Sequence, residues 1–234
     1  MQTTDVLKSD PRIGAYIFDL DGTLIDSESL WCEALVAYLS ERGKQLTLEQ
    51  ARAWVLGRAW HDIYRDVLVK WPDIKVDVIR MAQEVSPYYL AIRGKHDIRI
   101  HSSIEMLRNL AAHTPVSIVS GSQNEDIAEA IELMDVAAEV SFYLGSSDYS
   151  PGKPHPICFL SAAERFGVSA DRCVVFEDST AGILAGRRAG MHVVALARLE
   201  APGQDTAPAD LVVSDLAHYS PGALFEAISQ KSGG

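Results

Sequence analysis

Cysteine is scarce in this chain of 234 residues, where Cys32, Cys158 and Cys173 are odd in number, far apart and without a Cys-x-x-Cys pair. This spacing disfavours both a disulfide framework and a cysteine zinc site, and it is typical of reduced thiols in a cytoplasmic protein. The polar segment 1–11 lacks the basic-then-apolar layout of a secretory signal. No apolar run approaches the ~20 residues that span a bilayer, so we expect a soluble cytoplasmic protein.

Basic residues are also in the minority, with 21 Lys and Arg against 32 Asp and Glu and a net charge of -11. An acidic surface does not attract nucleic acid or anionic membranes, so neither is an expected partner. The same surface repels phosphorylated molecules at long range. Any phosphate chemistry therefore needs a local positive site, most simply a bound cation.

Short apolar runs rich in β-branched and aromatic residues recur along the chain, each flanked by polar residues or glycine. This pattern is typical of strands buried in a parallel sheet, and the helical patterns between them predict an α/β fold. The predicted strands are 15–18, 116–119, 173–176, 193–196 and 211–213. The predicted helices of this part are 103–112, 124–134, 157–166 and 181–189.

One stretch, from about residue 29 to residue 94, breaks the alternation because its apolar residues keep helical spacing throughout. We interpret it as a helical insertion after the first strand. Gly43 is expected to end its first helix, and Pro87 to kink or divide its last. The resulting predicted domains are 11–28 together with 95–228, and the insertion 29–94.

Two acidic residues, Asp19 and Asp21, follow the first apolar strand directly and precede Gly22. In an open parallel sheet, functional groups gather beyond the carboxyl ends of the strands. The two carboxylates could therefore serve one site, one attacking phosphorus and the other moving protons. The alternative interpretation is an ordinary turn, since Asp and Gly are common turn residues.

A second segment, Ser120-Gly121-Ser122, ends the next predicted strand and precedes a predicted helix. The Ser120 hydroxyl and the free N–H groups at that helix start could hold a phosphate oxygen. Ser-Gly-Ser is also an ordinary turn, and Ser122 or Asn124 could simply cap the helix.

A third segment places Lys153 between Pro151 and Pro154, whose rings fix φ and stiffen the backbone. A lysine held in this way is a suitable counter-charge for a phosphate and for a nucleophilic carboxylate. The alternative is a solvated lysine in a proline-rich turn. The adjacent His155 is expected to be structural.

In a fourth segment, Glu177 and Asp178 follow another predicted strand. Mg²⁺ prefers oxygen ligands and takes one or two protein carboxylates beside a substrate phosphate, which Asp19 and Asp178 could supply with Glu177 nearby. Asp178 or Ser179 could also cap the helix that follows. Together the four segments carry a nucleophile, a proton donor, a hydroxyl, a lysine and metal-binding acids.

In this order, the segments resemble the haloacid dehalogenase superfamily of phosphatases over nearly the whole chain, with further similarity to its β-phosphoglucomutase-like, sugar-phosphatase branch. The residues that carry the resemblance are Asp19-Leu20-Asp21-Gly22-Thr23, Asp26-Ser27-Glu28, Ser120, Gly152-Lys153-Pro154-His155-Pro156 and Glu177-Asp178-Ser179. The resemblance implies a doubly wound, Rossmann-like parallel sheet with an inserted small all-α cap domain.

The resemblance also implies residue roles. Asp19 would form an aspartyl-phosphate, and Asp21 would protonate the leaving oxygen and then activate water. Ser120 and the N–H of Gly121 would hold the phosphate, and Lys153 would balance the charge.

For Mg²⁺, the resemblance implies Asp19, Asp178 and the backbone carbonyl of Asp21 as ligands, with Glu177 as a direct or indirect helper. It also implies that the cap carries specificity residues. Arg58, in Leu56-Gly57-Arg58, is the first candidate, and Trp31 and His61 follow. Trp31 could equally be a core residue of the first cap helix, because buried aromatics dominate protein cores.

The leading hypothesis is a Mg²⁺-dependent phosphatase of a small phosphorylated metabolite, in the first place a sugar phosphate. A sugar-phosphate mutase is the alternative, which Trp31 disfavours because the β-phosphoglucomutases characteristically have His at the matching place. A non-catalytic phospho-acceptor signalling module is a third reading, but such a module needs neither a cap of this size nor Asp21. A monomer is the expected state, and the substrate stays open.

Overall fold

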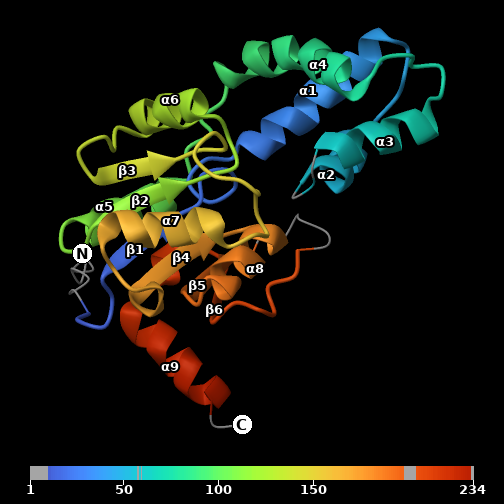
Figure 1. Cartoon of the computed structure of the whole chain (residues 1–234). Helices are drawn as coiled ribbons and strands as arrows, with labels where there is room; N and C mark the ends of the chain where they lie inside the picture. Colours follow the sequence, from blue (N-terminus) through green and yellow to red (C-terminus); the bar gives the residue numbers. More distant parts are fainter. Residues whose placement is uncertain (1–9, 57, 59, 198–203, 233–234) are drawn as a thin grey trace. The chain divides into compact units, whose positions relative to one another are not determined.

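Six parallel strands form one sheet in the computed structural model, which describes residues 10–56, 58, 60–197 and 204–232 (Figure 1). Their spatial order is β3-β2-β1-β4-β5-β6. The bounds are β1 Ala15–Phe18, β2 Val116–Val119, β3 Val140–Leu144, β4 Cys173–Glu177, β5 His192–Leu196 and β6 Leu211–Val213. The first strand of the chain is therefore central, between β2 and β4.

Helices and two short 3₁₀ turns connect the strands, and their bounds are α5 His101–Ala111, α6 Asn124–Met134, α7 Ile157–Phe166, η1 Ala170–Arg172, α8 Thr180–Arg188, η2 Leu216–His218 and α9 Pro221–Ser232. Strand residues alternate between two apolar layers, as the period of a strand requires. Ile17 and Val175 point into one layer with Phe159 of α7 and Ile183 of α8. On the other face, the Phe176 ring lies 4.5 Å from that of Phe18 and 4.8 Å from that of Tyr219.

A second compact unit, Asp26–Ile98, is entirely helical apart from its connections, with α1 Ser27–Glu41, α2 Leu48–Val55, α3 Trp60–Lys70 and α4 Val78–Arg93. It has its own apolar core, to which α1 contributes Leu35 and Leu39, and α4 contributes Met81 and Val85. Gly43 follows α1 with φ 68°, a left-handed conformation that suits glycine and ends the helix.

The predicted fold class is confirmed, because a parallel sheet flanked by helices carries a helical insertion after its first strand. The limits of the two domains, 11–28 with 95–228 and 29–94, stay a prediction. Pro87 does not divide the last helix of the insertion, since α4 continues through it. None of the helices in the described residues is long and apolar enough to cross a membrane.

The strand β3 is absent from the predicted set. Most of its residues are at least partly exposed because β3 is the edge of the sheet, and only Leu144 is buried. A continuous apolar run marks a buried parallel strand. Ser141 interrupts such a run in β3.

Candidate active site

The four segments with candidate residues follow β3, β2, β1 and β4, which are neighbours in the sheet. Asp19 comes directly after β1, with its N–H bound to the carbonyl of Phe176 at 2.9 Å. Its side chain is buried. Gly22, with φ 86°, allows the tight loop in which the N–H groups of Leu24 and Ile25 return to the carbonyl of Leu20. This loop lies at the edge where the carboxyl ends of the strands meet.

Lys153 joins three of these segments through its ammonium group. Its Nζ donates to Asp19 Oδ1 at 2.6 Å, to Glu177 Oε1 at 2.6 Å and to the Val119 carbonyl at 3.1 Å. Burial opposes the charge on Lys153, but the carboxylates of Asp19 and Glu177 outweigh it and raise the pKa of this lysine well above its usual range. Lys153 is therefore a fixed cation beside the Asp19 carboxylate.

Glu177, the last residue of β4, is fully buried. While its Oε1 accepts from Lys153, its Oε2 accepts from the backbone N–H of Ser179 at 3.0 Å and from the Ser179 hydroxyl at 2.9 Å. Ser179 is also the N-cap of α8, accepting from the N–H of Gly182. Both oxygens of Glu177 thus have protein donors, which fix its orientation.

A small oxygen-binding cation fits the acidic residues at this edge. Carboxylate oxygens of Asp19, Glu177 and Asp178 all lie within 4.8 Å of one another, and all three residues are buried. Burial and then the charge of Glu177 raise the pKa of Asp19 well above its usual range, although Lys153 lowers it. Three carboxylates against one ammonium leave a negative excess, and hard oxygen donors are the ligands of Mg²⁺. The residues present therefore suit the predicted Mg²⁺.

Asp21, partly exposed, is held by two hydroxyl groups from the loop after β2. Ser122 Oγ donates to Asp21 Oδ2 at 2.6 Å, and Ser120 Oγ donates to the same oxygen at 3.1 Å. The N–H of Ser122 in turn donates to Ser120 Oγ at 3.0 Å. Gly121 between them is exposed. The structure thus brings Ser120 to Asp21, and neither Ser122 nor Asn124 is the N-cap of α6, which is Gln123.

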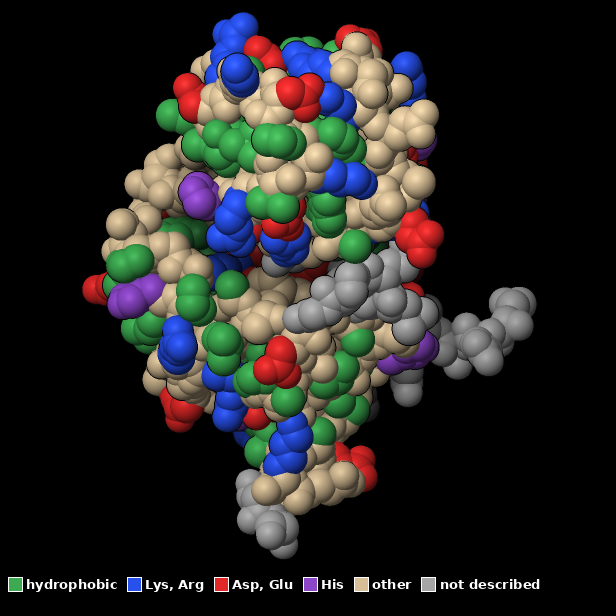
Figure 2. Space-filling model, turned by 90° about the vertical axis from the view of Figure 1, so that its right-hand side faces the viewer, with side chains coloured by type: hydrophobic (Ala, Val, Ile, Leu, Met, Phe, Trp, Pro, Cys, Tyr) green, Lys and Arg blue, Asp and Glu red, His purple; other side chains and the backbone are tan. Residues whose placement is uncertain are grey.

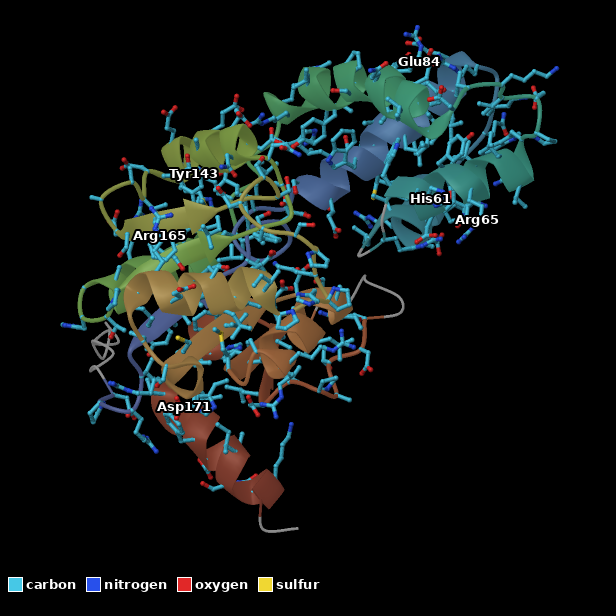
Figure 3. All side chains as sticks on the ribbon, viewed as in Figure 1. His61, Arg65, Glu84, Tyr143, Arg165 and Asp171 are labelled. Carbon is cyan, nitrogen blue, oxygen red and sulfur yellow. The ribbon has the colours of Figure 1, made fainter. Side chains whose placement is uncertain are left out.

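The candidate cap residues belong to the second unit. Arg58 Nη1 lies 2.7 Å from Asp66 Oδ2, so its guanidinium is paired inside that unit. Trp31 stacks on Tyr89 with ring centroids 4.2 Å apart, which supports packing inside the cap. His61 lies on α3 (Figure 3). The specificity roles of Arg58, Trp31 and His61 stay predictions.

Sequence reasoning did not assign three side chains that support this edge of the sheet. Ser122 binds Asp21, Ser179 binds Glu177, and the hydroxyl of Tyr149 donates to the Ser120 carbonyl at 2.7 Å. The available signal for Ser122 and Ser179 was their spacing, since each lies two residues after a residue at a strand end, Ser120 or Glu177. No sequence pattern pointed to Tyr149.

Comparison with known proteins agrees with this architecture. Residues 16–196 match the family model of haloacid dehalogenase-like hydrolases. The chain is 32% identical over 178 residues to a phosphoglycolate phosphatase of Xylella fastidiosa, covering 75% of this chain and 76% of that protein. It is 29% identical over 202 residues to a bifunctional riboflavin kinase/FMN phosphatase of Arabidopsis thaliana, covering 86% of this chain but 52% of that longer protein.

Among solved structures, a β-phosphoglucomutase from Clostridium difficile superimposes with a TM-score of 0.71 at 21% identity, covering 95% of this chain and 100% of that chain. This likeness concerns the fold. The predicted enzyme class agrees with the phosphatase names of the relatives. With a family model matched over most of its length, the chain belongs to the haloacid dehalogenase-like hydrolases.

Proposed function

We propose that this protein is a Mg²⁺-dependent phosphatase that hydrolyses a small phosphorylated metabolite through an aspartyl-phosphate on Asp19. The observation that carries the proposal is the buried Asp19 carboxylate at the end of the central strand, bound by Lys153 and two residues before Asp21. The phosphatase names of the relatives support the reaction class, and a sugar phosphate is the first substrate class to test.

In the first step, a carboxylate oxygen of Asp19 attacks phosphorus and the bond to the ester oxygen breaks. Asp21 donates a proton to the departing oxygen, so a neutral alcohol leaves. In the second step, Asp21 takes a proton from water, whose oxygen attacks phosphorus. Inorganic phosphate leaves and the Asp19 carboxylate is restored.

The remaining residues position the reacting groups. Lys153 offsets negative charge at Asp19 and on the phosphoryl oxygens, and Glu177 holds Lys153 in place. Asp19 and Asp178 would hold Mg²⁺ with the backbone carbonyl of Asp21, and Glu177, whose oxygens already have donors, would act through Lys153. When bound, Mg²⁺ supplies charge neutralisation at the phosphoryl oxygens.

A phosphate-release assay over a panel of phosphorylated metabolites, with and without Mg²⁺, tests this function. Asp19→Asn should lose roughly 10³-fold or more in kcat, because it removes the nucleophile while keeping the shape of the side chain. Asp171→Asn is the matched control, since Asp171 is an exposed carboxylate of the same unit (Figure 3). Full activity of Asp19→Asn would refute the mechanism.

Asp21→Asn separates the two half-reactions. Without the proton donor and base, hydrolysis should fall by about 10²- to 10⁴-fold. Substrates with good leaving groups should still phosphorylate Asp19, and the covalent phosphoryl group should persist and be visible by intact mass. Rapid turnover in this variant would contradict the role given to Asp21.

The same assay addresses the mutase alternative, because a mutase passes through a bisphosphate and releases little phosphate. No observation of the site favours that reading. The likeness to the β-phosphoglucomutase concerns the fold, and Trp31 stands where those enzymes characteristically have His.

A further inference from the structure

We propose that Tyr149 is a positioning residue that aims the N–H of Gly121 at the phosphoryl group. The inference deepens the proposed phosphatase function and rests on it. The single side-chain contact behind it is the hydrogen bond from the Tyr149 hydroxyl to the Ser120 carbonyl, at 2.7 Å.

The Ser120 carbonyl and the Gly121 N–H belong to one peptide unit. The cis peptide bonds in the described residues are 150–151 and 153–154, so the bond between Ser120 and Gly121 is trans. In a trans peptide the C=O and the N–H point in opposite directions within one plane. By holding the carbonyl, Tyr149 therefore sets the direction of the N–H on the other side.

That N–H is available to a ligand. Within the described chain, no group accepts a hydrogen bond from the Gly121 N–H, and Gly121 is exposed. A Cβ built at Gly121 would meet no atom within 4 Å, so the space around it is open. A free N–H beside Ser120 suits a phosphoryl oxygen, and a bond to its carbonyl polarises it into a stronger donor.

Tyr149 is held firmly enough to do this. Its ring packs against the core cluster that includes Phe159 and Val175. Burial raises its pKa to about 12, so the phenol keeps its proton at neutral and mildly alkaline pH. Lys153, four residues after Tyr149, binds the carbonyl of Val119, the residue before Ser120. The loop after β3 thus holds two successive carbonyls of the loop after β2, and Tyr149 holds the one whose peptide carries the Gly121 N–H.

Tyr149→Phe removes the hydroxyl and keeps the ring. With inorganic phosphate as the probe, in the presence of Mg²⁺, the inhibition constant should rise about fivefold, the scale of one hydrogen bond. The kcat/KM of the best substrate should fall by a similar factor, and the amide resonance of Gly121 should shift in the ligand-free protein. Tyr143→Phe on β3 is the control, because no hydrogen bond of the Tyr143 hydroxyl occurs in the described chain (Figure 3). It should leave all three quantities unchanged.

An unchanged inhibition constant and an unchanged Gly121 resonance in folded Tyr149→Phe would overturn the inference, as would equal changes in Tyr143→Phe. Should Tyr149→Phe fail to fold, Tyr149→Leu carries the same expectation, since it keeps apolar contact and lacks the hydroxyl. Absence of hydrolysis by the wild-type protein would count against the proposed function. The Gly121 resonance would then still decide whether Tyr149 orients that peptide.

Discussion

At the scale of single residues, Gly182 shows how closely the site is built against its own scaffold. Gly182 lies in the first turn of α8, and a Cβ placed there would overlap the carboxylate of Glu177. That carboxylate cannot move freely, because Lys153 binds one of its oxygens and Ser179 the other. The absence of a side chain at Gly182 therefore permits the buried arrangement of Glu177 and Lys153.

Gly182→Ala should displace Glu177 and break its bond to Lys153, leaving a buried charge without its partner. We expect a loss of about 2–4 kcal/mol in the free energy of unfolding and at least a tenfold fall in kcat. Urea denaturation and the phosphate-release assay measure the two effects.

Gly222→Ala is the matched control for this substitution. Gly222 lies in the first turn of α9, where a new Cβ would have its nearest neighbour, Ser220 Oγ, at 3.9 Å. Replacing glycine by alanine in an open helical position is neutral or stabilises by up to about 1 kcal/mol. Equal effects at positions 182 and 222 would refute the role given to Gly182.

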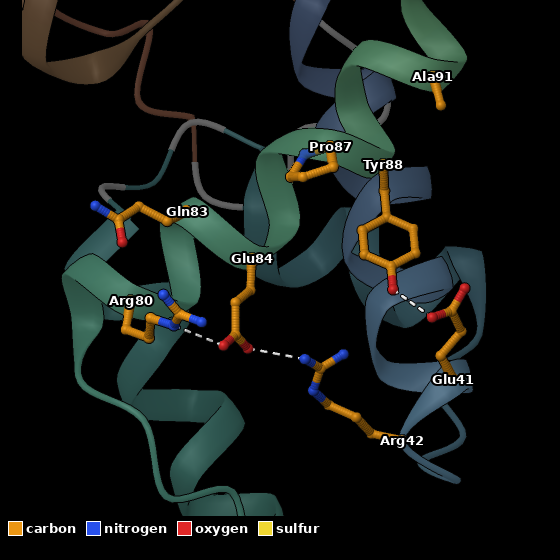
Figure 4. A pocket seen from close by; sticks show the side chains of 8 residues that line it. All are labelled: Glu41, Arg42, Arg80, Gln83, Glu84, Pro87, Tyr88 and Ala91. Carbon is orange, nitrogen blue, oxygen red and sulfur yellow. Dashed lines mark hydrogen bonds and ion pairs between the residues drawn. The ribbon is translucent and has the colours of Figure 1, made fainter.

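At the scale of elements, α4 is continuous although Pro87 lies in its interior. Proline has no N–H, so the carbonyl of Gln83 one turn earlier lacks its helical donor. Figure 4 shows Pro87 on α4 beside Gln83, Glu84 and Tyr88, all lining one pocket. Packing of Met81 and Val85 in the core of the unit keeps the helix whole despite this defect.

Pro87→Ala should therefore restore a hydrogen bond and stabilise the second unit by about 1–2 kcal/mol. The gain from better helix formation is partly offset, because alanine leaves the unfolded chain with more conformational entropy than proline does. All four tryptophans, Trp31, Trp54, Trp60 and Trp71, lie in this unit, so their fluorescence during urea denaturation reports on it alone. Gln83→Ala is the control, because Gln83 is exposed and both glutamine and alanine are good helix formers. It should leave the midpoint of urea denaturation unchanged. A lower midpoint in Pro87→Ala would show that the proline is needed by the fold.

Elements with a continuous apolar run or a regular helical apolar period were the ones predictable from sequence. The run at β1 and the helix 124–134 match the structure because their apolar periods are uninterrupted. The edge strand β3 was not predicted because Ser141 interrupts its apolar run, and the helix α9 was not predicted either.

The candidate site likewise has contacts that the sequence predicts and contacts that it does not. The gathering of Asp19, Glu177 and Asp178 follows from strand ends in a parallel sheet, which the sequence pattern indicates. Lys153 reaches them from the loop after β3, a strand that was not predicted. The hydroxyl of Tyr149 on the Ser120 carbonyl joins residues 29 positions apart through a loop conformation, and no local pattern encodes such a contact.

At the scale of the whole molecule, charge and burial act on stability through pH. On the face in view in Figure 2, basic and acidic side chains are intermixed, although the chain carries a net charge of -11. Inside the sheet domain, burial raises the pKa values of Cys158 and Cys173 to about 11 each. In the unfolded chain a thiol titrates near pH 8.5.

Above that pH, the unfolded chain loses thiol protons that the folded chain keeps, so unfolding becomes more favourable as pH rises. The stabilisation is complete below about pH 8 and is lost between about pH 8.5 and 11, on the order of 3 kcal/mol for each thiol, because one pKa unit corresponds to about 1.4 kcal/mol. Thermal unfolding followed by circular dichroism from pH 8 to 10.5 measures this slope. A double variant with Cys158→Ala and Cys173→Ala should lose stability less steeply as pH rises. An unchanged pH dependence would show that other groups cause the loss.

The two passages of the chain between its units lie side by side. The N–H of Asp26 donates to the carbonyl of Ile98 at 2.7 Å, and Ile25 pairs with Arg99 in an antiparallel bridge. A single hairpin turn could thus close the gap left by an excised 26–98, without shifting the register of β1. The helical insertion is therefore open to removal or replacement by another segment at this one point, with no second cut in the sheet domain.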